Sequence, residues 1–313
     1  MRYTEQSLPV GVIASAWSSL DVDLLVVPVF EGEVPALPAD LEAVVGPLVR
    51  AVIERREFTP KPFATLVLPA AGPGWRPERV MLAGFGTRAE CDARRVRRAA
   101  SAAALAARER RVRRLAMAAS GALPLADEAR AAAEGLTLAS HYSGIYKSGD
   151  EARPAPIEAL VVVPPATASA DVREAEREAG RGYILASCSN LARALTNEPA
   201  NVMTPRLFAD IAGQVGSDAG LRVDVLDEDR IAGLGMGLLL GVSRGSAEPP
   251  RVVVLRYDPP DAPARPLLGL VGKGVTFDTG GISIKPSDRM HLMKTDMAGG
   301  AAVLSAMKAV AAL

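Results

Sequence analysis

Five polar side chains that could bind a metal ion or move a proton lie within one short stretch of the chain, residues 271–300. They are Lys273, Asp278, Lys285, Lys294 and Asp296. Four glycines, at positions 272, 274, 280 and 281, let the backbone turn sharply between them. Carboxylates that lie close together in a cleft repel each other, and either an ammonium group or a metal ion relieves that repulsion. The stretch therefore predicts either a divalent metal site or a salt-bridged turn.

Lysine is rare in this chain, which makes its three occurrences between residues 273 and 294 informative. The chain has 36 basic residues, of which 6 are Lys and 30 are Arg. Arg stays protonated at any accessible pH, whereas the amine of Lys becomes a metal ligand once it loses its proton. Moving the pKa of Lys from about 10.4 to near neutrality costs about 4–5 kcal/mol, which a metal bond offsets. A retained Lys is therefore a candidate ligand, a role that Arg could not fill.

Short aliphatic runs alternate with Ala/Arg-rich stretches in the first half of the chain. The runs at 21–30, 64–69, 79–85, 113–119 and 158–163 predict strands, and the stretches at 41–58, 89–108 and 126–142 predict helices. Strands that alternate with helices of this length predict an α/β layer with a parallel or mixed sheet. Pro and small residues at 164–169 then precede a long predicted helix, residues 171–195. We therefore expect a domain boundary between residues 1–166 and residues 167–313.

The second half places the polar stretch after a predicted strand. Thr204 and Pro205 predict the N-cap and first position of a helix that runs to about Val215. Strands are predicted at 221–226, 251–257 and 267–271. The polar residues follow the last of these, so we expect them at the C-terminal edge of a parallel sheet.

Composition excludes several classes of protein. The formal net charge is zero, and 49% of the residues are apolar, so the chain is neither disordered nor drawn to nucleic acid by a global positive field. The aliphatic run at 231–242 is too short to span a bilayer, and no signal-like segment opens the chain, so we expect no membrane partner and a cytoplasmic location. Cys91 and Cys188 are too few for a disulfide scaffold, and we expect both to be buried.

Three blocks of sequence resemble one known family. VGKGVTFDTGGISIKPSDRMHLMKTDMAGG, residues 271–300, is similar to the signature of the leucyl aminopeptidase family, the cytosolic two-metal aminopeptidases. TNEPANVMTP (196–205) and GLGMGLLLGVSRGSAEPPRVVVLRY (233–257) resemble two further blocks. The resemblance covers roughly residues 170–313, and the rest resembles the family only in its α/β pattern. It implies a variable, macro-like N-terminal α/β domain followed by an incomplete α/β catalytic domain with a mixed central sheet.

The resemblance also implies a role for each matched residue. Lys273 matches the amine ligand of one metal ion, and Asp278 matches the carboxylate that bridges two ions. Asp296 matches a carboxylate ligand on the same ion as Lys273. Lys285 matches a charged lysine that stabilises the tetrahedral intermediate. Met293 matches a residue that lines the pocket for the first side chain of the substrate.

The implied reaction is release of N-terminal residues, preferably leucine, from peptide substrates. Two divalent ions (Zn²⁺, Mn²⁺ or Mg²⁺), roughly 3.5–4 Å apart, would share a hydroxide nucleophile and polarise the scissile carbonyl. Members of the resembled family form homo-hexamers, so the resemblance implies the same assembly for a full-length chain.

The sequence departs from the family pattern in two respects. First, His291 stands where relatives have Asp. Its neighbour Lys294 does match the family, at a basic position without assigned chemistry, and we expect it to form an ion pair. Second, the family completes its site with an Asp-x-Glu-x-Arg element, whereas the single Asp-x-Glu here is Asp40-Leu41-Glu42, with Val44 in place of Arg. The chain also ends within a helical pattern, residues 301–313. We therefore expect three of five side-chain metal ligands and no activity from these residues alone.

Two other functions compete with this interpretation. Gly241-Val242-Ser243-Arg244-Gly245 fits the G-x-S-x-G element of serine hydrolases, which requires a strand before Ser243 and a helix after it. The residues that follow Ser243 do not predict that helix. Nine arginines between Arg94 and Arg114 could neutralise the phosphates of DNA, or could form the solvated face of a helix.

Overall fold

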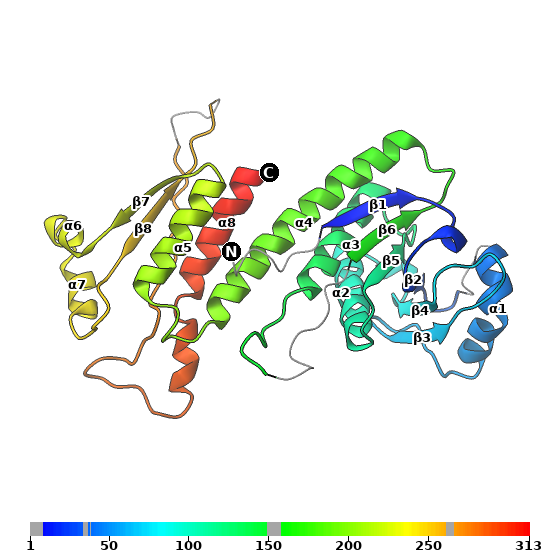
Figure 1. Cartoon of the computed structure of the whole chain (residues 1–313), viewed down its shortest axis with the longest axis horizontal. Helices are drawn as coiled ribbons and strands as arrows, with labels where there is room; N and C mark the ends of the chain where they lie inside the picture. The colour runs from blue at the N-terminus through cyan, green and yellow to red at the C-terminus, as the bar shows by residue number, and fades with distance from the viewer. Residues whose placement is uncertain (1–8, 34–36, 38, 149–157, 261–265) are drawn as a thin grey trace. The chain divides into compact units, whose positions relative to one another are not determined.

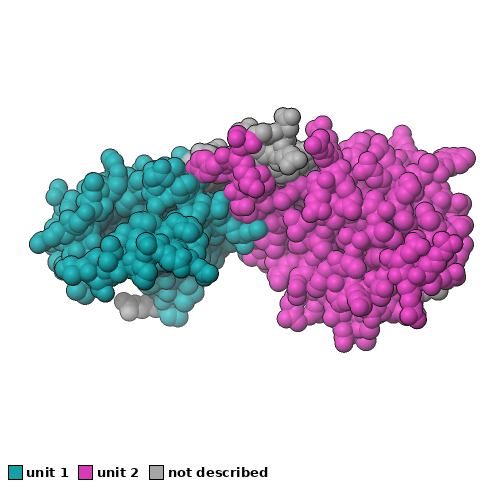
Figure 2. Space-filling model, turned by 90° about the horizontal axis from the view of Figure 1, so that it is seen from below, with its two compact units in different colours: residues 1–4, 188–313 teal, residues 5–187 magenta. Residues whose placement is uncertain are grey.

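The computed structural model describes residues 9–33, 37, 39–148, 158–260 and 266–313. The described chain divides into two compact units, one containing residues up to 187 and the other containing residues 188–313 (Figure 2). The dividing point lies within helix α4 (Ser169–Asn197), whereas the predicted domain boundary at 166/167 precedes that helix. The position of that boundary stays a prediction.

A six-stranded sheet forms the centre of the N-terminal unit. Its strands are β1 (Val10–Ala14), β2 (Leu24–Val29), β3 (Thr65–Pro69), β4 (Arg79–Gly84), β5 (Arg114–Ala118) and β6 (Glu158–Val163). They lie in the order β1-β6-β5-β2-β4-β3, and every pair is parallel except β3 with β4 (Figure 1). Five of the strands fall within predicted runs. The short alternation Val-Gly-Val-Ile-Ala of β1 was too weak a pattern to predict a strand.

Helices cover both faces of this sheet because successive residues of a strand point to opposite sides. Leu24 and Val26 of β2 belong to a core that includes residues of α2 (Ala93–Glu109) and α3 (Leu125–Ala139). Leu25 and Val27 belong to a second core, which includes residues of α1 (Ala39–Glu54). The three layers confirm the α/β fold class and the mixed sheet.

Helices α2 and α3 pack closely through small residues. The buried face of α2 consists of Val96 and the alanines at 99, 100, 103, 104 and 107. In α3, a Cβ atom added to Gly135 would lie 2.1 Å from the carbonyl oxygen of Arg97. The high alanine content of the chain therefore serves close helix packing in this unit.

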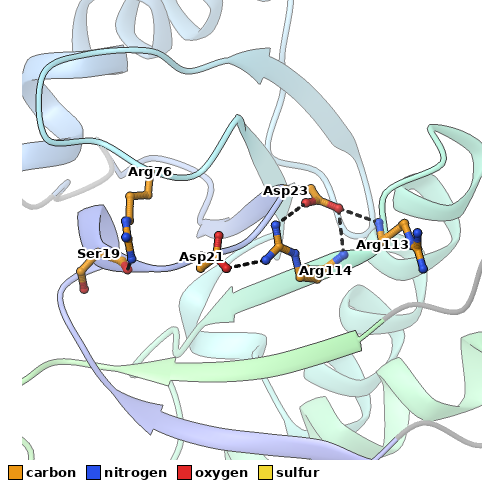
Figure 3. A network of polar contacts seen from close by, with 6 residues as sticks. All are labelled: Ser19, Asp21, Asp23, Arg76, Arg113 and Arg114. Atoms are coloured by element: carbon orange, nitrogen blue, oxygen red, sulfur yellow. Dashed lines mark hydrogen bonds and ion pairs between the residues drawn. The ribbon is translucent and has the colours of Figure 1, made fainter.

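A polar network joins the beginnings of β2 and β5 (Figure 3). The carboxylate of Asp23 accepts hydrogen bonds from the backbone N–H groups of Arg113 (2.9 Å) and Arg114 (3.0 Å). The Arg114 guanidinium also donates to Asp21 (2.5 Å) and to Asp23 (3.3 Å). Burial raises the pKa of Asp23, but the hydrogen bonds from Arg113 and Arg114 outweigh it and lower the pKa overall. The network therefore fixes β5 beside β2 with a charged carboxylate.

Helix α4 contributes to a core of each unit. Ala175 and Ala179 belong to the core that contains α2 and α3, and Leu191 and Leu195 belong to the core of the second unit. Charged residues recur through the first half of α4. Among the described residues, no helix is both long and apolar enough to cross a membrane.

The second unit carries the residues that match the family signature. Its regular elements are the end of α4, then α5 (Pro205–Asp218), β7 (Arg222–Leu226), α6 (Glu228–Gly233), α7 (Gly237–Ser243), β8 (Val252–Arg256) and α8 (Ala298–Ala312). Thr204 caps α5 by accepting a hydrogen bond from the Leu207 N–H (3.3 Å), and Pro205 takes the first helical position, as predicted. Strands β7 and β8 are antiparallel, and both contact α5.

The strand predicted at 267–271 is wrong. These residues pair with no strand in the described structure, and the side chains of Leu268 and Val271 are 88% and 98% exposed. An aliphatic run becomes a strand only where a neighbour supplies the hydrogen-bonding ladder, and no described residue does so here. The expected position of the site at the edge of a parallel sheet is therefore also wrong. The site is built from loops and the start of α8.

Candidate metal centre

Lys273 is held in place by contact between two glycine-containing segments. The backbone N–H of Gly300, in the first turn of α8, donates to the carbonyl oxygen of Lys273 (2.7 Å). A Cβ atom on Gly272 would lie 2.2 Å from the carbonyl oxygen of Gly299, so only glycine permits this approach. The pair Gly299-Gly300 was not among the predicted site residues, although the sequence MAGG shows it. These two glycines position the backbone of the candidate ligand.

A tight turn brings Lys285 back to Asp278. Gly280 and Gly281 have φ angles of 90° and 70°, a conformation that other residues rarely adopt. Asp278 accepts a hydrogen bond from the Gly280 N–H (2.8 Å), and the Lys285 N–H donates to the carbonyl oxygen of Thr279 (2.9 Å). As a result, Nζ of Lys285 lies 2.7 Å from Oδ2 of Asp278.

Asp296 completes the cluster from the other end of the signature. It follows a 3-10 helix, Met290–Thr295, and lies just before α8. Its Oδ2 atom lies 2.6 Å from Nζ of Lys273, and the same Nζ lies 3.5 Å from Oδ2 of Asp278. The structure therefore brings together Lys273, Asp278, Lys285 and Asp296, which the sequence predicts as one site.

The electrostatics of the cluster follow from these distances. The ammonium group of Lys285, the N–H of Gly280 and the ammonium group of Lys273 hold the pKa of Asp278 well below its usual range. The carboxylate of Asp296, together with that of Asp278, raises the pKa of Lys273. The protonated amine of Lys273 thus takes the place of a cation between two carboxylates.

The donor set fits a divalent cation that replaces the proton of Lys273. One neutral amine and two carboxylates converge, and divalent ions prefer such nitrogen and oxygen ligands. Oδ2 of Asp296 is buried and, apart from its ion pair with Lys273, accepts no hydrogen bond of regular geometry from a described residue. However, no group of three or more His, Cys, Asp and Glu side chains among the described residues is arranged so that it could hold a metal ion. The described part of the site therefore offers three ligands for one cation.

Both halves of the chain match domains of one protein family. Residues 26–150 match the N-terminal domain of the cytosol aminopeptidase family, and residues 190–313 match the catalytic domain of that family. The chain belongs to the cytosol aminopeptidase family. The four clustered side chains all lie in the catalytic-domain match.

Relatives in the cytosol aminopeptidase family are longer than this chain. The chain is 40% identical over 315 residues to a "Probable cytosol aminopeptidase" of Solibacter usitatus (strain Ellin6076), an alignment that covers 100% of this chain and 60% of the relative. It is 38% identical over 298 residues to a protein of the same name from Geobacter sp. (strain M21), covering 92% of this chain and 58% of that relative. The chain thus spans about 60% of the length of these relatives.

Solved structures of related proteins share the fold. The bottromycin maturation enzyme BotP in complex with Mn has a TM-score of 0.73 and 34% identity, covering 93% of this chain and 56% of that chain. A mutant of tomato leucine aminopeptidase has a TM-score of 0.79 and 27% identity, covering 97% of this chain and 59% of that chain.

The side chains of His291, Met293 and Lys294, all within the described part of the signature, form no hydrogen bond or ion pair with the four clustered side chains. Met293 is half-buried and His291 is exposed, both on the 3-10 helix. Nζ of Lys294 donates to the carbonyl oxygen of Asn197, and with the described residues it forms this hydrogen bond and not the expected ion pair. This bond connects the 3-10 helix to the TNEPANVMTP block and gives that block a structural role. The pocket role of Met293 stays a prediction.

The structure does not support a serine hydrolase at Ser243. Ser243 is the last residue of helix α7, and its hydroxyl donates to the carbonyl oxygen of Leu240 (3.1 Å). A nucleophile elbow would need a strand before the serine. Helix α7 occupies that position.

The arginine cluster at 94–114 is largely used within the N-terminal unit. Arg97 binds Glu134 (2.7 Å), Arg108 donates to the carbonyl oxygens of Ala139 and His141, and Arg114 binds Asp21. These contacts do not support the DNA-binding alternative. Cys91 and Cys188 are both buried, as expected, and burial raises the pKa of the Cys91 thiol.

Proposed function

We propose that this chain provides the N-terminal domain and the first metal ligands of a metal-dependent aminopeptidase that releases N-terminal residues, preferably leucine, from peptides. The observation that carries the proposal is the position of the Lys273 amine, 2.6 Å from Asp296 and 3.5 Å from Asp278. A salt-bridged turn alone would be served equally well by Arg, which this chain uses in 30 of its 36 basic positions. The membership of the chain in the cytosol aminopeptidase family supports the same reaction.

The residues of the cluster have two proposed roles: three would bind a cation, and Lys285 would stabilise negative charge on the substrate. Lys273, Asp278 and Asp296 would hold a divalent cation, with Asp278 positioned to bridge to a second. Divalent cations at such a site supply Lewis-acid activation of a peptide carbonyl and of water. Lys285 keeps a positive charge 2.7 Å from Asp278 and is about one-third exposed, so it can face the oxygen of a substrate carbonyl as negative charge develops there. Met293 would line the pocket for the first side chain.

Further parts of the proposal are inferred from the resemblance of the chain to the family. We infer two ions, drawn from Zn²⁺, Mn²⁺ and Mg²⁺, a homo-hexameric assembly of the full-length protein, a cytosolic location, and a boundary between the domains at residues 166/167. We also propose that residues 1–313 alone hold two ions only weakly and do not turn over peptides. The Asp-x-Glu-x-Arg element that supplies further carboxylates in the family does not occur in residues 167–313.

A chimera tests the proposed reaction. The part of the Solibacter usitatus relative that lies beyond the alignment is fused after Leu313, and hydrolysis of leucyl p-nitroanilide is measured with added Mn²⁺. We expect activity that is lost on treatment with a chelator, and loss of at least a hundredfold in the chimera with Lys273→Met. The matched control, Lys294→Arg, keeps a donor for the carbonyl of Asn197 and should retain activity.

Two results would contradict the proposal. A folded chimera that cleaves no aminoacyl anilide would remove the assigned reaction. Two submicromolar Mn²⁺ sites in residues 1–313 alone, measured by calorimetric titration, would show that these residues need no further ligands.

A further inference from the structure

A cavity in the N-terminal unit has no role in the proposed reaction. It has a volume of about 350 Å³ and lies between the turn at 62–63 and the residues at and before the start of α2. Its size is at the lower end of the range for small-molecule sites, about 300–1,000 Å³. Its lining combines three arginines with two carboxylates and an apolar wall.

Two glycines and one arginine shape this cavity. A Cβ atom on Gly84 would lie 2.1 Å from the carbonyl oxygen of Lys61, and one on Gly86 would lie 2.9 Å from Pro62. Gly84-Phe85-Gly86 therefore lets the turn at 60–63 approach the end of β4. Arg95, which lines the cavity, donates to the carbonyl oxygen of Phe85 (3.3 Å), and this bond holds its side chain beside the end of β4.

The arginine that is free to bind a ligand is Arg98. Its guanidinium lies 4.5 Å from the centre of the Phe63 ring, and it makes no hydrogen bond or ion pair with any described residue. A guanidinium stacked on an aromatic face keeps its N–H donors, which lie in its own plane, available for a carboxylate. Phe63 itself has a φ angle of 71°, unusual for a bulky residue, and this conformation places its ring in the cavity wall.

The two carboxylates limit which ligand the cavity accepts. Glu90 lies 3.3 Å from Arg95, and Asp92 lies 3.5 Å from Arg94, both on the exposed side of the lining. Arg94 and Arg95 pair with these carboxylates, so among the described residues of the lining the positive charge without an ion pair is that of Arg98, which attracts a carboxylate. The carboxylates beside it oppose a second negative charge, such as that of a phosphate dianion. A ligand that carries both charges is attracted to both groups.

We propose that this cavity binds a small zwitterion, a free α-amino acid with an apolar side chain. Its carboxylate would pair with Arg98, its ammonium group with Glu90, and its side chain would lie against Phe63 and Pro62; Asp92 is already occupied as the N-cap of α2. The cavity lies wholly within the N-terminal unit, so the proposal does not depend on the aminopeptidase function.

Calorimetric titration of the 313-residue protein with L-leucine, in the presence of a chelator, tests the site. We expect saturable binding in the wild type and in Lys273→Met, which alters only the candidate metal centre. Arg98→Gln and Glu90→Gln should each weaken binding at least tenfold. The matched control Arg110→Gln lies beyond the other end of α2, outside this cavity, and should bind as the wild type does.

Two analogues of leucine test whether the cavity needs both charged groups of the ligand. L-Leucinamide lacks the carboxylate, and 4-methylpentanoate lacks the ammonium group, so each should bind at least tenfold more weakly than leucine. The proposal is overturned if leucine does not bind, if it binds Arg98→Gln and Glu90→Gln as it binds the wild type, or if inorganic phosphate binds more tightly than leucine.

Discussion

The two units of this chain differ in how many of their apolar side chains are exposed. In the N-terminal unit, the aliphatic strands lie between two layers of helices, and most of the residues of β2 and β4 are buried. In the second unit, Leu268, Val271 and Ile282 are almost fully exposed, and the sheet has only the strands β7 and β8 among the described residues. These side chains thus lie outside the core that the described residues of the second unit form.

The two units also differ in what their ion pairs connect. In the N-terminal unit, pairs such as Arg97 with Glu134 and Arg114 with Asp23 join elements of the fold. In the second unit, the charges of the signature converge with each other on glycine-rich loops, where they join no two strands. Catalytic and binding residues are often found on loops held by a rigid scaffold. The candidate metal ligands thus lie on loops of the second unit, whereas the ion pairs of the N-terminal unit join regular elements.

The largest expected effect is on the buried core of the N-terminal unit. Phe85 is fully buried and packs edge-on against Phe30, with ring centroids 5.6 Å apart. We expect Phe85→Ala to lower the free energy of unfolding by about 3–5 kcal/mol. Val271→Ala, at a 98% exposed position, should change it by no more than about 0.5 kcal/mol. Urea denaturation followed by far-UV circular dichroism measures both, and similar losses in the two variants would remove the contrast.

The glycine contact at Lys273 should give the next largest effect. A Cβ atom on Gly272 would meet backbone atoms of Gly299, whereas one on Gly274 would meet no atom within 4 Å. We expect Gly272→Ala to cost about 1–3 kcal/mol of stability, because the backbone must move, and to weaken Mn²⁺ binding. Gly274→Ala is the matched control and should leave both unchanged. Thermal unfolding and calorimetric titration check this pair, and equal behaviour of the two variants would show that the contact does not position Lys273.

The smallest expected effect is a pH dependence in the network of Figure 3. The pKa of Asp23 is lowered in the folded chain, so its contribution to stability is present above the unfolded pKa, about 3.9, and is lost as the pH falls through the folded value. Asp23→Asn should cost about 1 kcal/mol at pH 7 and less at acid pH. Urea denaturation across pH 3–7 measures this, and a cost that stays constant with pH would contradict the assigned charge.

The sequence predicts the strands β2 to β6 and the start of α5 well because their signals are local. β6 lies at the predicted residues 158–163, and the N-cap at Thr204 is confirmed, because alternation, apolar runs and caps depend on neighbouring residues. The strand predicted at 267–271 fails because pairing depends on residues far away in the chain. Apolar composition alone cannot supply a hydrogen-bonding ladder.

The sequence predicts four side chains as one site, and the structure brings them together, but on loops and not at the expected sheet edge. Lys273, Asp278, Lys285 and Asp296 come together because glycines 280 and 281 form a turn whose need for a positive φ is visible in the sequence. The contact of Gly272 with Gly299 could not be predicted, since it joins two segments that are far apart in the chain and adjacent only in the folded unit. The cavity beside Arg98 is likewise formed by a turn, a strand end and a helix that are adjacent only in the folded unit.

The central claim is that the Lys273 amine gives up a proton to bind a cation. Because Asp296 and Asp278 raise the pKa of Lys273, the amine is protonated at pH 7, and a cation must displace that proton. Calorimetric titration of Mn²⁺ in buffers of different ionisation enthalpy counts the protons released. We predict about one proton per ion and an affinity that rises about tenfold per pH unit, both lost in Lys273→Arg and both kept in Lys294→Arg. Unchanged affinity and proton release in Lys273→Arg would contradict the claim.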